Sequence, residues 1–245
     1  MPFKPNLPNK KVSKVYMSAQ FPNFCRELNL LGITTVNTSD IAGFLPFEAM
    51  HADMQFLPID EDCAFILSTA ADVLPEDIKK LYKTFTEIPV PDNTGYPNNV
   101  LLNIAVINQK AFGLKKAVPQ AVLDEMSVRN MEFIDVNQGY AKCSAAVVAD
   151  NAVITADVSI YNACKSEGID VLKISAGNII LPKCNYGFIG GCCGKISQDT
   201  LAFSGNIKLH PDYRNIKDFC KNYNTDLLSL SNEPLIDIGG IIPIN

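Results

Sequence analysis

The sequence lacks any long apolar run. No stretch of its 245 residues reaches the roughly 18 uninterrupted apolar residues that a membrane-spanning helix needs. The beginning of the chain, MPFKPNLPNKK, has no apolar core of the kind found in a secretory signal peptide. We therefore expect a cytoplasmic protein with no membrane partner.

Clustered positive charge is also scarce. The formal net charge is -5, and the densest basic group is the short run of Lys10, Lys11 and Lys14. Binding to a phosphate backbone requires several clustered lysines and arginines. The sequence therefore predicts no nucleic-acid partner, and the three lysines are interpreted as a solvated face.

Charged residues make up only 19% of the chain and hydrophobic residues 47%, a composition that excludes intrinsic disorder. The eight cysteines are scattered, contain no Cys-x-x-Cys motif, and lie in a chain too large to need disulfides. We therefore expect reduced thiols, no metal site and no cofactor.

Histidine occurs only twice, each time two residues before an aspartate. His51 and Asp53 lie in EAMHADMQFLPI, where alternation along a strand would put both on one face with Gln55. This pattern favours a lined pocket over an exposed strand edge. His210 lies in KLHPDYRNI and is either a general base or a neighbour of a helix N-cap, with Asp212 favouring the helix end.

Helix-like and strand-like stretches alternate about five times. The predicted helices cover 23–31, 74–85, 118–130, 157–168 and 211–224. The predicted strands cover 33–36, 54–59, 63–68, 87–90, 100–107, 133–136, 141–149, 152–156, 171–174, 178–182, 187–191, 201–205, 227–231 and 235–244. Two or more strands follow each helix, whereas a doubly wound sheet returns to helix after one. Five repeated units within one domain, 1–245, are therefore favoured over an open α/β sheet.

Two glycine-rich segments carry a family resemblance. ISAGNIILPKCNYGFIGGCCGKI, residues 174–196, is similar to the Gly-Gly-Asp strand-turn-strand segment of arginine deiminases. LIDIGGIIPI, residues 235–244, is similar to the glycine-rich last strand of the same proteins. The chain thus resembles the pentein, or guanidino-group-modifying enzyme, superfamily, and more closely an uncharacterised clostridial-type family of that fold. The resemblance implies an α/β fold, a five-bladed α/β-propeller of pseudo-fivefold ββαβ units.

The resemblance also implies which residues catalysis would need. Catalytic penteins use a thiolate from the last strand, a histidine–carboxylate pair and acidic residues that hold the guanidinium, whose carbon is deactivated by resonance. Here Gly239 and Gly240 are followed by Ile241 to Asn245 with no cysteine, and Asn178 occupies the place of an aspartate. We therefore predict a protein that lacks the usual activity and either binds a small polar ligand in an axial pocket or interacts with another protein.

The alternative is a hydrolase or amidinotransferase that acts on C–N bonds of guanidino or amidino compounds. Cys192 or Cys193, in GFIGGCCGK, would be a displaced nucleophile and His210 its general base. Lys195 would lower the pKa of such a thiol, although free cysteines also serve as small buried apolar residues. A ribosome-binding pentein is disfavoured by the acidic charge.

The candidate ligand-binding residues are polar side chains within otherwise apolar segments. They are expected to converge on the axis, where buried polar groups need partners or a ligand. They are His51, Asp53, Asn103, Asn137, Asn178 and Asp237.

Overall fold

The strands of the chain form five separate three-stranded sheets in a computed structural model that describes residues 4–244. The first sheet contains β15 (Ile242–Ile244), β1 (Lys14–Met17) and β2 (Thr34–Asn37). The second contains β3 (Phe56–Pro58), β4 (Cys63–Leu67) and β5 (Thr84–Ile88), and the third β6 (Ala105–Ile107), β7 (Lys110–Gly113) and β8 (Glu132–Asp135). The fourth contains β9 (Ala145–Ala149), β10 (Ala152–Thr155) and β11 (Asp170–Lys173), and the fifth β12 (Cys193–Ser197), β13 (Thr200–Phe203) and β14 (Asp226–Ser229).

The helices fall into two groups. Those that connect the middle to the outer strand of a sheet are α1 (Pro22–Leu30), α3 (Ser68–Ala71), α4 (Glu76–Lys79), α5 (Gln120–Val128), α7 (Val158–Ser166) and α8 (Tyr213–Asn222). Two short 3-10 turns, η1 (Lys115–Ala117) and η3 (Ile207–Leu209), lie in the same kind of connection. The second group, α2 (Ala52–Gln55), α6 (Ala141–Ser144) and η2 (Gly190–Cys192), precedes inner strands.

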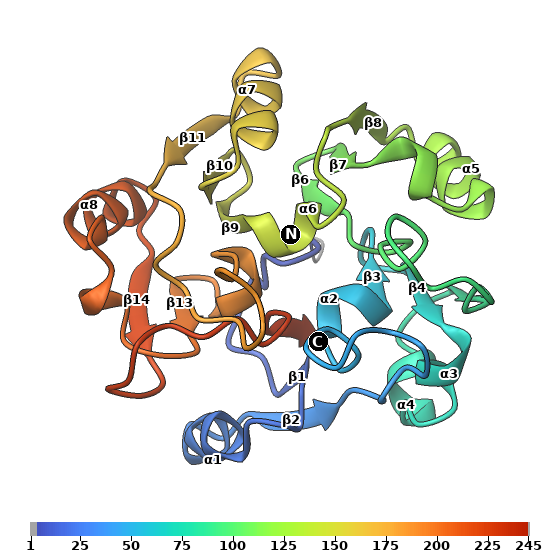
Figure 1. Ribbon diagram of the computed structural model, residues 1–245, viewed down its shortest axis with the longest axis horizontal. Helices are drawn as coiled ribbons and strands as arrows, with labels where there is room; N and C mark the ends of the chain where they lie inside the picture. The colour runs from blue at the N-terminus through green and yellow to red at the C-terminus, as the bar shows by residue number, and fades with distance from the viewer. Residues whose placement is uncertain (1–3, 245) are drawn as a thin grey trace.

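Every sheet has the same internal order. An inner strand pairs antiparallel with a middle strand, and the middle strand pairs parallel with an outer strand. A parallel pair requires a crossover connection, and a helix provides it in each unit. The inner strand of the first sheet is β15, which comes from the other end of the chain. Figure 1 shows the five units arranged around a common centre.

Four of the five inner strands are wholly apolar, whereas β12 also contains Lys195 and Ser197. β3, β6 and β15 are buried throughout, and β9 is buried except at its last residue. Strands covered on both faces lose the usual apolar–polar alternation, because neither face meets water. Their side chains fill the space between the sheets, whereas the connecting helices bury one face against the sheets.

A short helical turn precedes several inner strands at one end of the molecule. α2 precedes β3, α6 precedes β9 and η2 precedes β12, while Gly239 and Gly240 precede β15. Figure 1 shows α2 and α6 close to the centre of the ring. These turns, drawn from different units, therefore bring side chains from distant parts of the sequence together.

The predicted elements need several corrections. Residues 141–149 begin as helix α6, residues 187–191 form a loop that enters η2, and residues 178–182 contribute only an isolated bridge, Ile180 to Ile236. The predicted helix 74–85 is shorter, because α4 covers only Glu76–Lys79 and β5 begins at Thr84. Each departure involves a glycine, a proline or a change of backbone direction near the centre. β1, β7 and β12 were not predicted.

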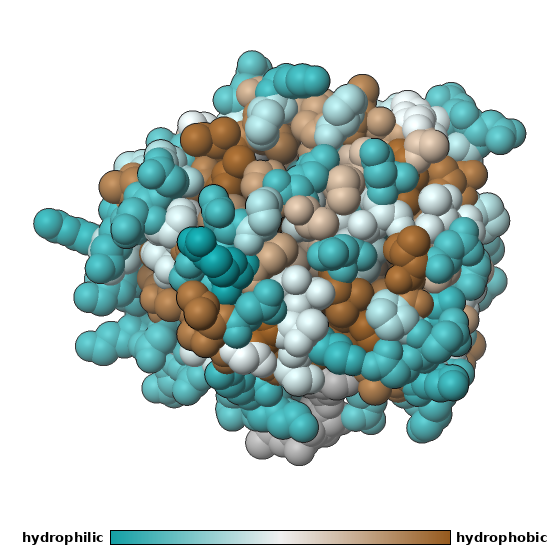
Figure 2. Space-filling model, turned by 90° about the horizontal axis from the view of Figure 1, so that it is seen from below, coloured by the Kyte–Doolittle hydropathy of each residue, from teal (hydrophilic) through white to brown (hydrophobic). Residues whose placement is uncertain are grey.

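The surface is mainly polar, with isolated apolar side chains. Figure 2 shows hydrophilic residues around most of one face and hydrophobic ones in separate patches among them. Leu30 and Val128, at the ends of α1 and α5, are among the exposed apolar residues. Of the helices in residues 4–244, none has the length and apolar character required to cross a membrane.

Candidate functional site at the centre of the five sheets

Five buried polar residues from four of the units meet near the centre: His51, Asp53, Asn103, Cys143 and Asp237, which we call the central cluster. Each is no more than 4% exposed. Burying a polar group costs free energy unless the group forms hydrogen bonds. A cluster of five such residues is therefore stable only if they hydrogen-bond to one another or to a ligand.

Asp53 and Cys143 are in direct contact. The Cys143 thiol donates to Asp53 Oδ2 over 2.9 Å, whereas Asp53 Oδ1 has no hydrogen-bond partner. The backbone N–H of Asp53 donates to the carbonyl of Gly239 at 3.0 Å, which joins α2 to the segment that leads into β15. One carboxylate oxygen is therefore buried and unpaired in an otherwise well-anchored residue.

Asn103 holds the beginning of α6. Its Oδ1 accepts from the backbone N–H groups of Lys142 and Cys143, at 2.8 and 3.2 Å. Its Nδ2 lies 3.1 Å from the Cys143 sulfur and 3.3 Å from the carbonyl of Asp53. Asn103 thus satisfies N–H groups that the first helical turn leaves unpaired, and it fixes the position of the thiol.

Asp237 is fixed by backbone donors. Its Oδ1 accepts from the N–H of Gly239 at 3.0 Å, and its Oδ2 accepts from the N–H of Phe188 at 2.9 Å. Its Oδ1 also lies 3.8 Å from His51 Nδ1. A Cβ atom at Gly191 would overlap the carboxylate, so glycine is required there for the backbone to come this close.

Burial changes the acidity of two members of the cluster. It raises the pKa of Asp53 to about 6, with the nearby carboxylate of Asp237 adding to the increase and His51 opposing it. Burial, followed by the charge of Asp53, raises the pKa of Cys143 well above the usual value for a thiol. Without a ligand, therefore, the environment favours the neutral thiol of Cys143.

A cavity of about 140 Å³ opens onto the cluster. His51 and Asp237 of the cluster line it, and its other lining residues are Gln20, Phe21, Pro46, Phe47, Leu181, Pro182 and Lys183. Cys143 and Asp53 do not line it. The cavity therefore gives access to the imidazole and to one carboxylate, with the second carboxylate and the thiol behind them.

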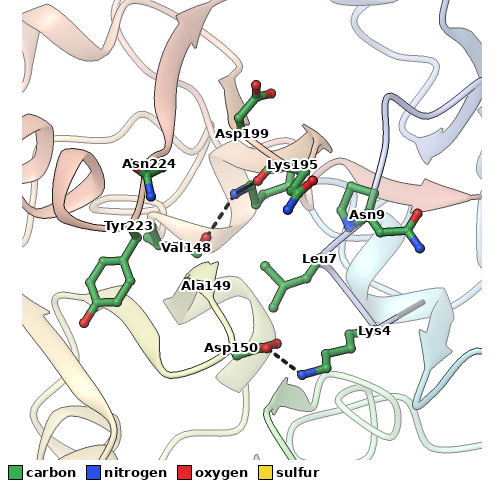
Figure 3. A pocket seen from close by; sticks show the side chains of 12 residues that line it. Lys4, Leu7, Asn9, Val148, Ala149, Asp150, Lys195, Asp199, Tyr223 and Asn224 are labelled. Atoms are coloured by element: carbon green, nitrogen blue, oxygen red, sulfur yellow. Dashed lines mark hydrogen bonds and ion pairs between the residues drawn. The ribbon is translucent and has the colours of Figure 1, made fainter. Parts of the chain in front are cut away.

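A second cavity, of about 360 Å³, lies at the opposite end of the inner strands β9 and β12. Figure 3 shows the Lys195 side chain pointing to the carbonyl of Val148 in this cavity. The Lys195 ammonium also donates to the carbonyl of Gln198 and the hydroxyl of Thr225, at 2.6 and 2.9 Å. Burial lowers the pKa of Lys195, yet all three of its donor positions are filled.

The predicted catalytic residues lie in separate environments. The Cys192 thiol donates to the carbonyl of Ile189 at 3.2 Å, and Cys193 packs in an apolar cluster. The imidazole of His210 accepts from the N–H of Asp212 through Nδ1 at 3.1 Å, and its Nε2 has no partner. Within residues 4–244, no hydrogen bond joins a histidine to a thiol.

The structure brings together four of the six predicted ligand-binding residues: His51, Asp53, Asn103 and Asp237. Asn137 and Asn178 are exposed and lie elsewhere. The Asn178 side chain donates to Ser175 and to the carbonyl of Ala176, as in a local turn.

The predicted strand through His51 is also wrong. His51 is the N-cap of helix α2, so Asp53 is placed by a helical turn and not by strand alternation. Gln55 belongs to another network, in which it accepts from the Tyr16 hydroxyl at 2.8 Å.

Cys143 is the functional candidate that the sequence reasoning missed. The segment AKCSAAVVA predicts one continuous strand, whereas its first four residues form the short helix α6 before β9. A signal was present: Cys143 lies two residues before the inner strand β9, and Asn103 two residues before the inner strand β6. Aligning the units on their inner strands would have placed both at the same end.

The family model described as "Family of unknown function (DUF6873)" matches residues 17–242. The chain belongs to this family. No curated protein matches it.

Solved structures of guanidino-modifying enzymes share the architecture of this DUF6873 chain. SxtG, an amidinotransferase from Microseira wollei, has a TM-score of 0.58 at 11% identity, covering 94% of this chain and 91% of its own. Dimethylarginine dimethylaminohydrolase from Pseudomonas aeruginosa has a TM-score of 0.55 at 9% identity, covering 94% and 96%. Agmatine deiminase from C. jejuni has a TM-score of 0.54 at 9% identity, covering 94% and 93%. At these identities the likeness shows the fold, so the predicted pentein resemblance is confirmed at that level.

Proposed function

We propose that the protein binds a small monovalent cation of the guanidinium or amidinium type at the central cluster. The observation that supports this most directly is the cavity above His51 and Asp237, behind which Asp53 has an unpaired, buried carboxylate oxygen. A cation that reached the cluster would give this oxygen the partner it lacks.

Charge and shape both favour such a ligand. The carboxylates of Asp53 and Asp237 repel each other, and the positive charges that act on Asp53 are those of His51 and Lys142. An added cation would reduce the repulsion between the two carboxylates. A guanidinium is flat and presents paired N–H donors, a geometry that matches carboxylates. The cavity is smaller than the roughly 300 Å³ at which drug-sized sites begin, so it would hold a head group and leave the remainder of the ligand outside.

The solved structures support the same ligand class. Those proteins are an amidinotransferase, a dimethylarginine dimethylaminohydrolase and an agmatine deiminase. The repeated sheet order also supports the finer description of the chain, residues 1–245, as a single five-bladed α/β-propeller of pseudo-fivefold ββαβ units. Membership of a clostridial-type group stays a prediction.

Binding is favoured over catalysis because the thiols that catalysis would use, those of Cys143, Cys192 and Cys193, are buried and do not line the cavity. The last strand, β15, contains only Ile242, Pro243 and Ile244. Burial raises the pKa of both Cys192 and Cys193, and neither contacts His210. The predicted alternative, a hydrolase using these cysteines and His210, is thus less well supported.

A second candidate is hydrolysis of a guanidino or amidino compound by Cys143. The observation in its favour is that the Cys143 sulfur, a carboxylate oxygen of Asp53 and a ring nitrogen of His51 lie within 4.8 Å of one another. The thiolate would attack the central carbon and release ammonia, and water would then release the ureido product. The inaccessible thiol argues against this candidate.

Calorimetric titration with methylguanidine, and with methylurea as its neutral isostere, tests the binding proposal. We expect methylguanidine to bind and methylurea not to bind. Asp53→Asn and Asp237→Asn should each weaken binding at least tenfold, since a charge-assisted contact is lost. Asp150→Asn, at the cavity shown in Figure 3, is the matched control and should bind normally. Equal affinity for the two compounds would refute the proposal.

Incubation with arginine, agmatine and methylated arginines, followed by assays for ureido product and ammonia, separates the two candidates. The binding proposal predicts no turnover. Turnover that disappears in Cys143→Ser and persists in Cys192→Ser would establish catalysis by Cys143 instead.

A further inference from the structure

The central cluster contains three different types of metal ligand. His51, Asp53 and Cys143 each offer one atom, and these atoms lie within 4.8 Å of one another. Tetrahedral zinc, with bonds of roughly 2.0 to 2.3 Å, places its ligand atoms roughly 3.3 to 3.8 Å apart. The Cys143 sulfur and Asp53 Oδ2 are 2.9 Å apart and would separate by roughly half an ångström, and the His51 ring nitrogen, within 4.8 Å of both residues' ligand atoms, would move inward to reach that geometry.

The three ligands have the supporting contacts that a metal site requires. Asn103 holds the Cys143 sulfur, and the carboxylate of Asp237 lies 3.8 Å from Nδ1 of His51. A carboxylate beside a ligating histidine commonly sets the orientation of the imidazole ring. Asp53 is anchored through its backbone N–H, while its Oδ1 has no partner. This buried unpaired oxygen is the independent indication that something else binds here.

Access and a fourth coordination position are also available. The cavity of about 140 Å³ reaches His51 directly, so an ion could enter and a water molecule could complete the coordination. An imidazole, a carboxylate and a thiolate form a mixed set that suits a borderline-soft ion better than Mg²⁺ or Ca²⁺, which prefer oxygen ligands.

We infer that His51, Asp53 and Cys143 together bind a thiophilic divalent cation of the Zn²⁺ type. Binding replaces the proton that the Cys143 thiol shares with Asp53: the sulfur–metal bond forms, the S–H bond breaks and one proton is released to solvent. The inference departs from the sequence analysis, which expected no metal. It rests on the proposed function only in that metal and organic cation would compete for the same carboxylates.

Cobalt(II) titration of protein treated with a chelator and desalted is a direct test, because a cobalt–thiolate bond produces a near-ultraviolet charge-transfer band. We expect one equivalent to bind, with the band lost on addition of Zn²⁺ and one proton released per metal. Cys143→Ser should abolish the band and weaken Zn²⁺ binding at least a hundredfold, measured against a chromophoric chelator.

Two control variants make the assignment specific. Cys192→Ser removes a neighbouring buried thiol, and Cys184→Ser removes an exposed one. Both should retain the band. If Cys143→Ser does not fold, as judged by circular dichroism, His51→Gln should weaken Zn²⁺ binding at least tenfold while the cobalt–thiolate band remains at higher metal concentration.

The outcomes separate this inference from the proposed function. If no band appears, or if the band is lost in Cys184→Ser and retained in Cys143→Ser, the metal site is refuted, whether or not methylguanidine binds. If the metal binds at Cys143 and methylguanidine fails to bind, the proposed function is refuted and the metal site stands. Competition between the two ligands would support both.

Discussion

The two ends of the inner strands differ in whether their buried charged groups are fully hydrogen-bonded. At the end shown in Figure 3, the Lys195 ammonium donates three hydrogen bonds to groups of the protein. At the other end, Asp53 has one oxygen without a partner, behind a cavity that is lined by His51 and Asp237. Because both ends have a cavity, hydrogen bonding distinguishes them: a fully satisfied buried charge is explained by the fold alone, whereas an unsatisfied one indicates a ligand. We therefore assign a structural role to the end that contains Lys195 and a functional role to the end that contains Asp53.

The largest expected effect comes from closing the space around Asp237. In Gly191→Ala the new Cβ would overlap the carboxylate, which two backbone N–H groups hold in place. We expect a loss of about 3 kcal/mol in the free energy of unfolding, as for a severe overpacking substitution. Urea unfolding measures it, and Gly95→Ala in an exposed loop is the control. A loss below about 0.5 kcal/mol would show that the carboxylate is not tightly held.

The second prediction concerns the satisfied end. Lys195→Met keeps the aliphatic volume but leaves the carbonyls of Val148 and Gln198 without this donor. We expect a loss of about 2 kcal/mol in the free energy of unfolding, because buried acceptors lose their partner. Binding of methylguanidine should not change. Loss of binding without loss of stability would mean that the functional end has been wrongly assigned.

The third prediction is an increase in the free energy of unfolding, whereas the first two are decreases. Asp53→Asn removes a buried negative charge whose Oδ1 has no partner, so the free energy of unfolding should rise by about 1 kcal/mol in metal-free protein. Methylguanidine and metal binding should both weaken. Urea unfolding in the presence of a chelator provides the measurement. Clear destabilisation would indicate that Asp53 serves the fold and not a ligand.

Much of the fold could be predicted from the sequence, because it follows from local patterns. The helices 23–31, 118–130, 157–168 and 211–224 were predicted within one or two residues at their starts and ends, since an apolar stripe and a following turn define them. The hairpin at Asp150 and Asn151 was also correct. The central turns were missed, because an apolar run of small residues such as AKCSAAVVA suits a short helix as well as a strand.

The site was predicted only in part, for a related reason. Asp53 and Asp237 were found because a charged residue in an apolar segment is conspicuous. Cys143 was not, because a cysteine in such a segment is indistinguishable from core. Asn178 was included through the family resemblance, yet its side chain bonds within its own exposed turn. Which polar groups meet at the centre depends on how five units pack, and no local pattern contains that information.

The smallest effect is expected at His210, the second histidine. It is buried and outside the central cluster, and burial lowers its pKa, although the carboxylate of Asp212 opposes the shift. A histidine whose folded pKa is lowered resists protonation in the folded protein. As the pH falls through about 6.5, the unfolded chain takes up a proton that the folded chain does not, so stability falls.

His210→Gln should therefore reduce the loss of stability between pH 7.5 and pH 5.5 relative to the wild type, with little effect at pH 7.5. Glutamine keeps a side-chain acceptor for the N–H of Asp212, which the imidazole Nδ1 now provides. Urea unfolding at the two pH values measures the difference. Lys208→Gln, an exposed substitution two residues away, should retain the full wild-type dependence. If His210→Gln retains it as well, burial of a neutral imidazole is not the cause of the loss of stability at low pH.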